Sequence, residues 1–385
     1  MESSISITSK LPLVGTTIFT TMSALAQRHQ AINLSQGFPD FPPDPILVEY
    51  LNQASAAGHH QYAPMPGLLL LREQVARRTE ALHRASYDPD SEITITCGAT
   101  EALFGAFQAF VHPGDEVVLF SPAYDSYEPG IRLAGGIPVF VPLTFPDYQI
   151  DWEAVGKAIS PKTRGIVINS PHNPSGAIIT ASDVEKLGQL AEAHDLWVIS
   201  DEVYDHMVFD GYGQLSLAGD SKLSPRTMVI SSFGKTLHTT GWKVGYCLAP
   251  EKMMAEFRKV HQFLTFSVAT PFQYAIASYL QHQAGEMDDL PRFYQRKRDL
   301  FLSLTSGSSL KPLHSSGTYF QLMDFSEVRP GSDLEMSTWL TQVVGVACIP
   351  VSVFYPDGTD HQVIRFCFAK QDETLVRAAE RLRIL

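Results

Sequence analysis

Seven short apolar runs between residues 93 and 248 constrain the fold more than any other feature of the sequence. Most of them are apolar through their middle, as strands are when both faces of a sheet are covered. Stretches with helical periodicity, such as 101–110 and 182–194, separate several of the runs. This alternation predicts an α/β fold with a mostly parallel, seven-stranded sheet between helices. The expected strands are 93–96, 117–120, 138–141, 165–169, 197–200, 228–231 and 244–248.

The C-terminal third of the chain has a different pattern. Residues 251–304 read as helices with breaks near Pro271 and Gly285, and residues 310–385 mix strands with helices. A change from alternation to such a mixture indicates a second, smaller α+β domain. We expect an N-terminal segment at 1–40 that joins the small domain, a large domain at 41–280 and a small domain at 281–385.

Several local patterns predict individual elements outside the sheet. Asp44 and Pro45 suit the cap and first turn of a helix at 46–57. The other elements expected from periodicity are an amphipathic piece near 19–29, helices at 68–82, 333–343 and 372–382, and strands at 318–323 and 363–368.

Composition and charge argue against several classes of function. The chain is 44% hydrophobic and 18% charged, as ordinary globular enzymes are. A net charge of −12 disfavours a nucleic-acid or anionic-membrane partner, because both attract basic proteins. The four cysteines and the histidines lack the spacing of a disulfide framework or a metal site. With no signal-peptide pattern and no long apolar run, we expect a cytoplasmic protein without a metal.

The stretch 231–243 follows an expected strand and carries two lysines, Lys235 and Lys243. Glycines and hydroxyl side chains surround Lys235; they allow close backbone approach and offer hydrogen bonds to phosphate oxygens. A partly desolvated lysine in such a place has a lowered pKa and an amine available for a Schiff base. A solvated loop is the simpler interpretation of this stretch taken alone.

Three more strand ends carry candidate ligand-binding residues. Ala99 and Thr100 begin a helix whose free N–H groups suit a phosphate, although an ordinary strand–helix turn has the same pattern. Tyr124 offers a flat face to a flat ligand, or packs within its loop. The proline turns at 169–176 hold Asn173 rigidly, with its amide able to donate to a ligand oxygen. We interpret the neighbouring His172 as a turn residue and not as a general base.

Charged residues at two further strands complete the set. Asp201 follows a buried strand, where a carboxylate is costly unless a cation or donor pairs with it or it caps the next helix. Tyr204 can point to the same side, and Glu202 is expected to be exposed. Arg365 lies inside an apolar strand, where its planar fork suits a ligand carboxylate or a structural ion pair.

Together these residues describe a site for pyridoxal 5′-phosphate (PLP), with a lysine, a carboxylate, a phosphate seat, an aromatic face and an arginine. From Asn33 to Arg365 the sequence resembles the class I/II aminotransferases of PLP fold type I. The motifs are Asn-Ser-Pro-His-Asn-Pro-Ser-Gly at 169–176, Ser-Asp-Glu-Val-Tyr at 200–204 and Ser-Phe-Gly-Lys-Thr at 232–236. Ser-Gln-Gly-Phe-Pro-Asp-Phe at 35–41 and Thr-Gly-Trp-Lys-Val-Gly at 240–245 are most similar to the branch with methionine and kynurenine/glutamine aminotransferases.

The resemblance implies a role for each cofactor-binding residue. Lys235 would form the Schiff base and carry the proton between the substrate Cα and the cofactor, and Asp201 would pair with the pyridinium nitrogen. Many relatives have an arginine where this chain has Lys243. The remaining cofactor contacts would be Asn173 and Tyr204 to the phenolate oxygen, Tyr124 to the ring, and Ala99, Thr100, Ser232 and Lys243 to the phosphate.

The resemblance also implies how substrate binds and how subunits assemble. Arg365, Asn173 and the backbone near Gly37 would bind the substrate carboxylate. Tyr62 would reach the phosphate of a neighbouring subunit, which implies a homodimer with shared sites. No second arginine stands out for a dicarboxylic substrate, so methionine, aromatic amino acids, histidine or glutamine are expected in preference to aspartate. The expected apolar walls are Phe38, Phe41, Tyr62, Phe354 and Tyr355.

The activity implied is ping-pong transamination from an L-amino acid to a 2-oxo acid. A PLP-dependent β-lyase acting on cysteine conjugates would use the same residues and is the alternative. A non-catalytic regulator would need a DNA-binding module, and residues 1–30 are too few and not basic.

Overall fold

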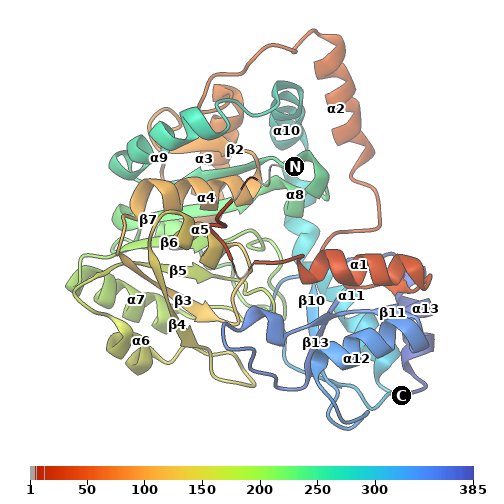
Figure 1. The fold of residues 1–385 in the computed structure, drawn as a ribbon. Helices are drawn as coiled ribbons and strands as arrows, with labels where there is room; N and C mark the ends of the chain where they lie inside the picture. The colour runs from red at the N-terminus through yellow and green to blue at the C-terminus, as the bar shows by residue number, and fades with distance from the viewer. Residues whose placement is uncertain (1–4, 6, 13) are drawn as a thin grey trace.

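The computed structural model describes residues 5, 7–12 and 14–385 and contains the predicted seven-stranded sheet (Figure 1). Its strand order is β2-β8-β7-β6-β5-β3-β4, and all neighbours are parallel except β8, which is antiparallel to both β2 and β7. The strands are β2 (Ile93–Thr96), β3 (Glu116–Ser121), β4 (Ile137–Pro142), β5 (Thr163–Asn169), β6 (Trp197–Asp201), β7 (Thr227–Ser232) and β8 (Gly245–Leu248). The predicted strands match these within two residues at each end.

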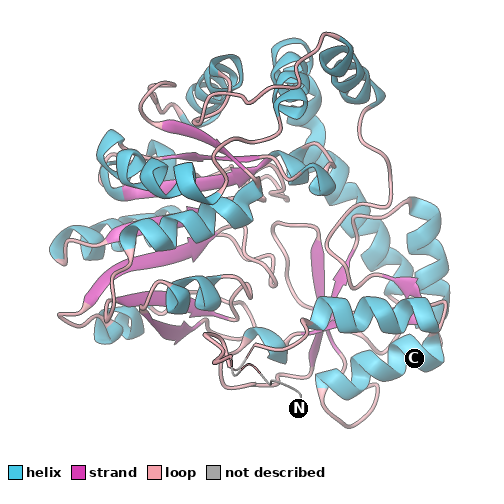
Figure 2. Ribbon diagram, turned by 45° about the horizontal axis from the view of Figure 1, so that its top comes forward, coloured by secondary structure: helices cyan, strands magenta, loops and turns pink. Residues whose placement is uncertain are grey.

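Helices cover both faces of this sheet, as Figure 2 shows. Alternate residues of one strand supply the two faces: Val117 and Leu119 of β3 pack with α4, α5 and α9, whereas Val118 packs in the core with α3, α6 and α7. Both faces are therefore apolar, which explains the continuous apolar runs of the sequence. The helices are α3 (Leu69–His83), α4 (Gly98–Phe110), α5 (Tyr127–Leu133), α6 (Trp152–Ala158), α7 (Ala181–Ala193) and α9 (Glu251–Leu264).

A second, four-stranded antiparallel sheet has the order β12-β13-β10-β9. The helix α1 and the strand β1 lie beside the C-terminal elements in Figure 1, and β1 pairs in parallel with β11. The elements here are α1 (Ile18–Arg28), β1 (Ile32–Asn33), β9 (Lys311–Pro312), β10 (Phe320–Asp324), α12 (Asp333–Trp339), β11 (Val346–Ala347), β12 (Ile349–Pro350), β13 (Val363–Cys367) and α13 (Asp372–Leu382).

The remaining helical elements complete the fold. They are α2 (Pro45–Ala56), α8 (Phe233–Thr236), α10 (Thr270–Gln283) and α11 (Leu290–Thr305), with the 3-10 turns η1 (Leu217–Gly219), η2 (Ser224–Arg226), η3 (Thr240–Trp242), η4 (Ala284–Asp289) and η6 (Ser352–Phe354) and the π-helical turn η5 (Leu340–Val344). The predicted cap of α2 is confirmed, since Asp44 accepts a hydrogen bond from the backbone N–H of Ile46. Within the described residues no helix is long and apolar enough to cross a membrane.

The breaks expected near Pro271 and Gly285 are confirmed: the helical stretch is interrupted at 265–269 and again by η4. Pro271 lies in the first turn of α10, where its missing N–H costs nothing. Two expected boundaries are wrong. The strand expected from 318 starts at Phe320, because Thr318 has a left-handed φ of 67°. The helix expected at 333–343 changes to a π-helical turn after Trp339.

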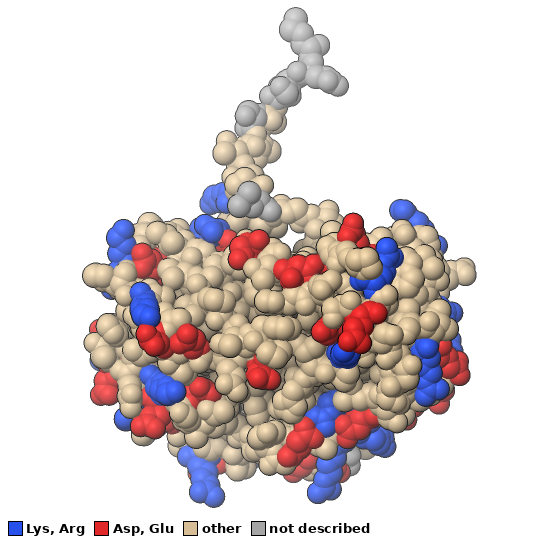
Figure 3. Space-filling model, turned by 90° about the horizontal axis from the view of Figure 1, so that it is seen from below, with Lys and Arg blue, Asp and Glu red and all other residues tan. Residues whose placement is uncertain are grey.

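On the face in Figure 3, acidic and basic side chains are interspersed.

Candidate active site

A pocket opens at the carboxyl ends of the parallel strands, where sheets of this type bind ligands. It contains about 710 Å³ of empty space, part of it open to solvent. Asn169, Asp201 and Ser232 are the last residues of β5, β6 and β7, so three adjacent strands deliver them to one place. The predicted residues that line the pocket are Ala99, Thr100, Tyr124, Asn173, Asp201, Tyr204, Ser232, Lys235 and Lys243.

Lys235 lies in the single helical turn α8, directly after β7. Its amine donates hydrogen bonds to the hydroxyl of Tyr319 at 2.8 Å and to the carbonyl of Gly37 at 3.4 Å. Burial of the ammonium, together with the nearby charges of Lys243 and Arg365, lowers the pKa of Lys235 to about 8. The neutral amine, which can act as a nucleophile or base, is therefore far more abundant near neutral pH than for a lysine with the usual pKa of 10.5.

Asp201 is a buried carboxylate in the floor of the pocket. Its Oδ2 accepts a hydrogen bond of 2.6 Å from the hydroxyl of Tyr127. Burial raises the pKa of Asp201 to about 6, although the Tyr127 hydrogen bond acts in the opposite direction. Among the described residues no cation lies within ion-pair distance of it, and it accepts only weakly from the backbone of Val203 at 3.4 Å. A cationic ligand nitrogen would supply the missing partner.

Arg365 is fully buried and has no carboxylate partner within the described chain. Its Nη1 donates to Oδ1 of Asn173 at 2.7 Å, its Nη2 approaches the carbonyl of Ser35 at 3.4 Å, and its Nε is unpaired among the described atoms. The guanidinium lies 3.9 Å from the centroid of the Phe320 ring. The alternative of a structural ion pair is therefore wrong, and the arginine keeps donors for a ligand carboxylate.

Asn173 and Tyr204 both line the pocket. The backbone N–H of Asn173 donates to Oδ1 of Asn169 at 2.8 Å, and its own Oδ1 is used by Arg365. Its amide N–H groups therefore remain for the pocket. Tyr204 is buried, and its ring packs edge-on against that of Tyr319 with centroids 5.2 Å apart. Burial raises the pKa of Tyr204 above the usual 10, so its hydroxyl stays protonated.

The N-terminus of α4 and the η3 segment form an anion seat. Cys97, the residue before α4, makes no side-chain capping bond, so the first N–H groups of the helix face the pocket unused by a cap. Lys243 adopts a left-handed backbone with φ 55°, and its Nζ lies 3.5 Å from where a Cβ on Gly98 would be. A phosphate would fit here, because the N-terminus of α4, the ammonium of Lys243 and the hydroxyls of Thr100 and Ser232 all lie around this part of the pocket.

Three predicted residues, Gly37, Tyr62 and Arg365, are not among the residues that line this pocket. Tyr62 is 81% exposed and packs edge-on against Phe266, with ring centroids 5.2 Å apart. Gly37 turns its carbonyl oxygen toward Lys235. A Cβ on Gly37 would come within 2.7 Å of the Phe320 ring, so this close approach requires glycine.

The expectation that Glu202 is exposed is wrong. It is 2% exposed and lies on the opposite face of the sheet from Asp201. The hydroxyl of Ser200 donates to it at 2.7 Å and the backbone N–H of Leu217 at 3.0 Å. Burial raises its pKa to about 7. The preference for His172 as a turn residue agrees with its hydrogen bonds to Ser175 and Pro122, and burial lowers its pKa to about 4.

The expected aromatic walls lie outside the group of pocket-lining residues. Phe354 and Tyr355 are buried, and Phe41 packs edge-on against His238 at 4.8 Å between ring centroids. Phe38 is 42% exposed, with the Lys370 ammonium over its ring. Sequence reasoning missed Asn169, Tyr127, Thr240 and Tyr319. Asn169 and Thr240 lie within the quoted motifs, whereas Tyr127 and Tyr319 carry no local signal. Tyr319 meets Lys235 across 84 residues of chain.

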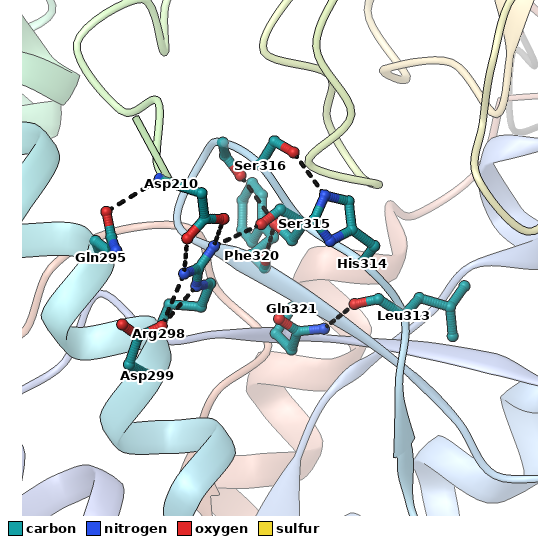
Figure 4. Close-up of polar contacts among 11 residues, drawn as sticks. Asp210, Gln295, Arg298, Asp299, Leu313, His314, Ser315, Ser316, Phe320 and Gln321 are labelled. Atoms are coloured by element: carbon teal, nitrogen blue, oxygen red, sulfur yellow. Dashed lines mark hydrogen bonds and ion pairs between the residues drawn. The ribbon is translucent and has the colours of Figure 1, made fainter. Parts of the chain in front are cut away.

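A cluster of hydrogen bonds around Arg298, called here the arginine cluster, holds the segment before β10 against the loop after β6 (Figure 4). Arg298 of α11 donates to both oxygens of Asp210, at 2.6 and 2.7 Å, and to the carbonyl of Ser315 at 2.8 Å. Backbone bonds from Phe209 to Ser316 and a bridge between 208 and 317 extend this junction. The junction lies directly before Tyr319, whose hydroxyl contacts Lys235, and before β10, which begins at Phe320.

The donor set of the pocket fits PLP. The lysine with a lowered pKa suits the carbonyl of that cofactor, and the buried carboxylate, which has no cation beside it, suits the pyridine nitrogen. The anion seat suits the phosphate, and the ring of Tyr124 suits the pyridine ring.

Comparisons with known proteins identify the class. The aminotransferase class I and II family profile matches residues 29–382. The chain belongs to this family, so it is an amino-acid aminotransferase that uses pyridoxal 5′-phosphate.

Within this family, individual relatives are similar over almost the whole chain. The chain is 51% identical to the methionine aminotransferase of Escherichia coli (strain K12), over 98% of each chain. It is 36% identical to human kynurenine–oxoglutarate transaminase 1, over 93% of each. A crystal structure of the Escherichia coli protein described as having a methionine aminotransferase function superposes with a TM-score of 0.97 at 50% identity, covering 99% of this chain and all of the other. The resemblance to the methionine and kynurenine aminotransferase branch is confirmed.

Proposed function

We propose that this aminotransferase takes its amino group from methionine or a similar apolar, aromatic, histidine or glutamine-type L-amino acid. The observation that carries the proposal is Arg365, a buried guanidinium with donors free for one α-carboxylate. The cations among the residues that line the pocket are Lys235 and Lys243, and neither is an arginine fork for a second carboxylate. The 51% identity to a methionine aminotransferase supports the same substrate class.

We further propose how the pocket holds the cofactor. Lys235 is its covalent attachment point, Asp201 pairs with its pyridine nitrogen, and Tyr124 covers its ring. When bound, PLP supplies an electron sink that acidifies the Cα–H bond of an attached amino acid. The phosphate contacts are Ala99, Thr100, Ser232 and Lys243, and the contacts to the phenolate oxygen are Asn173 and Tyr204.

The protein's own groups then divide the work of a ping-pong reaction. Arg365 and Asn173 bind the substrate carboxylate, and so fix the Cα relative to Lys235. The neutral amine of Lys235 removes the Cα proton and carries it to the cofactor side, because its lowered pKa leaves the amine partly unprotonated. Asp201 stays ionised once a cation lies beside it. A 2-oxo acid acceptor reverses these steps.

The assembly and organisation of the chain are also proposals. We propose a cytoplasmic homodimer in which Tyr62, 81% exposed in one subunit, completes the phosphate seat of the other. The pairing of β1 with β11 supports assigning 1–40 to the small domain at 281–385, apart from the large domain at 41–280. All four cysteines are free thiols, as suits a reducing compartment.

Steady-state kinetics with methionine, phenylalanine and aspartate as donors tests the proposal. We expect kcat/KM for methionine to exceed that for aspartate by on the order of 10²-fold or more, because the pocket lacks a fork for a second carboxylate. A higher kcat/KM for aspartate contradicts it. Pyruvate and ammonia released from a cysteine conjugate without a 2-oxo acid would instead indicate the β-lyase alternative.

A further inference from the structure

Tyr319 is a fully buried residue at the pocket, just before β10, to which neither the motifs nor the family comparison assigns a role. The amine of Lys235 donates to its hydroxyl at 2.8 Å and to the carbonyl of Gly37 at 3.4 Å. The Tyr319 hydroxyl donates its own proton to the same carbonyl. Amine, hydroxyl and carbonyl therefore close a triangle in which the donor of each hydrogen bond is defined.

The Tyr319 ring is fixed by aromatic neighbours on several sides. Its centroid lies 5.2 Å from that of Tyr204, 4.9 Å from that of Phe320 and 5.8 Å from that of Tyr294. A ring packed in this way cannot swing its hydroxyl away without repacking the core. The hydroxyl is a fixed acceptor, and the flexible Lys235 side chain is the partner that moves.

Transamination detaches the Lys235 amine from the cofactor while the substrate is attached, so the free amine has to be held close to the Cα. A neutral amine has two N–H groups and one lone pair. If both N–H groups are donated, the lone pair is the part left for the proton. We propose, on the basis of the function proposed above, that the Tyr319 hydroxyl and the Gly37 carbonyl hold the detached Lys235 amine and orient its lone pair toward the substrate Cα.

The proton transfer balances with Tyr319 as a positioning residue. The Cα–H bond breaks, its electron pair stays on the carbon side, and the proton binds the amine lone pair to give an ammonium. The ammonium keeps the same two acceptors, and these hydrogen bonds become stronger because the donor is now charged. Burial raises the pKa of Tyr319 well above 10, so its hydroxyl keeps its proton throughout.

Tyr319→Phe tests the proposal, with Tyr294→Phe as the matched control. The control removes a neighbouring buried hydroxyl that has no hydrogen-bond partner among the described residues. With Tyr319→Phe we expect unchanged PLP affinity, a first half-reaction with methionine slowed on the order of 10- to 100-fold, and a larger isotope effect with α-deuterated methionine. We expect the control to stay within about twofold of wild type. A wild-type rate and isotope effect in Tyr319→Phe, or equal losses in both variants, would overturn the proposal.

A second measurement does not depend on the loaded enzyme. In cofactor-free protein, the pH dependence of reductive methylation at Lys235, followed by peptide mass spectrometry, gives the pKa of its amine. We expect Tyr319→Phe to lower it by about one unit, since an acceptor of the ammonium is lost, and Tyr294→Phe to leave it unchanged. An unchanged pKa in Tyr319→Phe would contradict the proposal.

The wild-type protein provides a test if the variant does not fold. In a crystal structure with pyridoxamine 5′-phosphate, Lys235 Nζ within hydrogen-bond distance of the Tyr319 hydroxyl supports the proposal, and an amine turned elsewhere overturns it. Failure of the proposed function is distinct: a wild-type protein that binds PLP but transaminates no amino acid contradicts that function, whatever Tyr319→Phe does.

Discussion

Arg365 and Asn173, which lie 192 residues apart in the chain, share a hydrogen bond of 2.7 Å between Nη1 and Oδ1. The bond joins β13 of the four-stranded sheet to the proline turn after β5 of the seven-stranded sheet. It fixes one edge of the guanidinium and leaves the other donors for a ligand. A substrate carboxylate bound there would therefore contact elements of both sheets at once.

Arg365→Lys should impair substrate binding while sparing the cofactor. A lysine keeps the charge but loses the fork, so we expect kcat/KM for methionine to fall on the order of 10²- to 10³-fold. PLP affinity should stay within about threefold, because Arg365 lies outside the residues that line the cofactor pocket. Equilibrium dialysis of PLP beside the kinetics separates the two effects, and loss of both together would argue against the assignment.

Asp201 should give the cofactor-free protein a characteristic pH dependence. Folding raises the pKa of Asp201 from 3.8 to about 6, so the folded state holds the proton more tightly and stability falls as pH rises through that interval. The full effect is about 3 kcal/mol. Burial also raises the pKa of Glu202, so Glu202 adds a pH dependence of the same sign. The stability of the wild type is therefore compared with that of Asp201→Asn, which lacks only the contribution of Asp201 to this pH dependence. Urea unfolding at pH 4 and pH 7 should show wild type losing more stability than the variant. Equal losses would contradict the inferred burial cost.

Lys235 should control how fast the cofactor is captured. Burial lowers the pKa of its amine to about 8, and only the neutral amine attacks the PLP aldehyde. We expect the rate of covalent attachment to rise with pH and to level off above about pH 8. Stopped-flow absorbance with cofactor-free protein measures it. A rate still rising toward pH 10 would mean that the amine is as solvated as in free lysine.

The arginine cluster of Figure 4 should contribute to stability and to the shape of the site. Arg298→Lys loses the fork on Asp210 and the contact with Ser315, so we expect a loss of about 1–3 kcal/mol in the free energy of unfolding. Arg292→Lys is the control, because that side chain is 89% exposed and its ion pair spans 3.7 Å. Similar denaturation midpoints for both variants would show that the junction is dispensable.

Much of this architecture could be predicted from the sequence, because the signals are local. Strands such as 117–120 are buried on both faces, so every residue is apolar, and the proline turn that holds Asn173 is encoded within eight residues. Asp201 and Lys235 could be predicted as site residues because they lie at or just after the ends of the expected strands 197–200 and 228–231, and parallel strands end at one edge of a sheet.

What could not be predicted depends on contacts between distant parts of the chain. Tyr319 meets Lys235, and Tyr127 meets Asp201, through packing that no local pattern encodes. Glu202 was misplaced because a carboxylate next to a strand end is normally exposed, and its donors come partly from Leu217, fifteen residues on. Tyr62 is 81% exposed and does not line the pocket of its own chain, so its predicted role depends on a second subunit.

The visible absorption spectrum of the purified protein with PLP, before and after methionine and beside Lys235→Ala, tests the central claim most directly. We predict a yellow band in the wild type that bleaches on adding methionine, with formation of the corresponding 2-oxo acid, and no such covalent band in Lys235→Ala. A wild-type band that methionine leaves unchanged would contradict the proposed substrate class. The same band in Lys235→Ala would contradict the site itself.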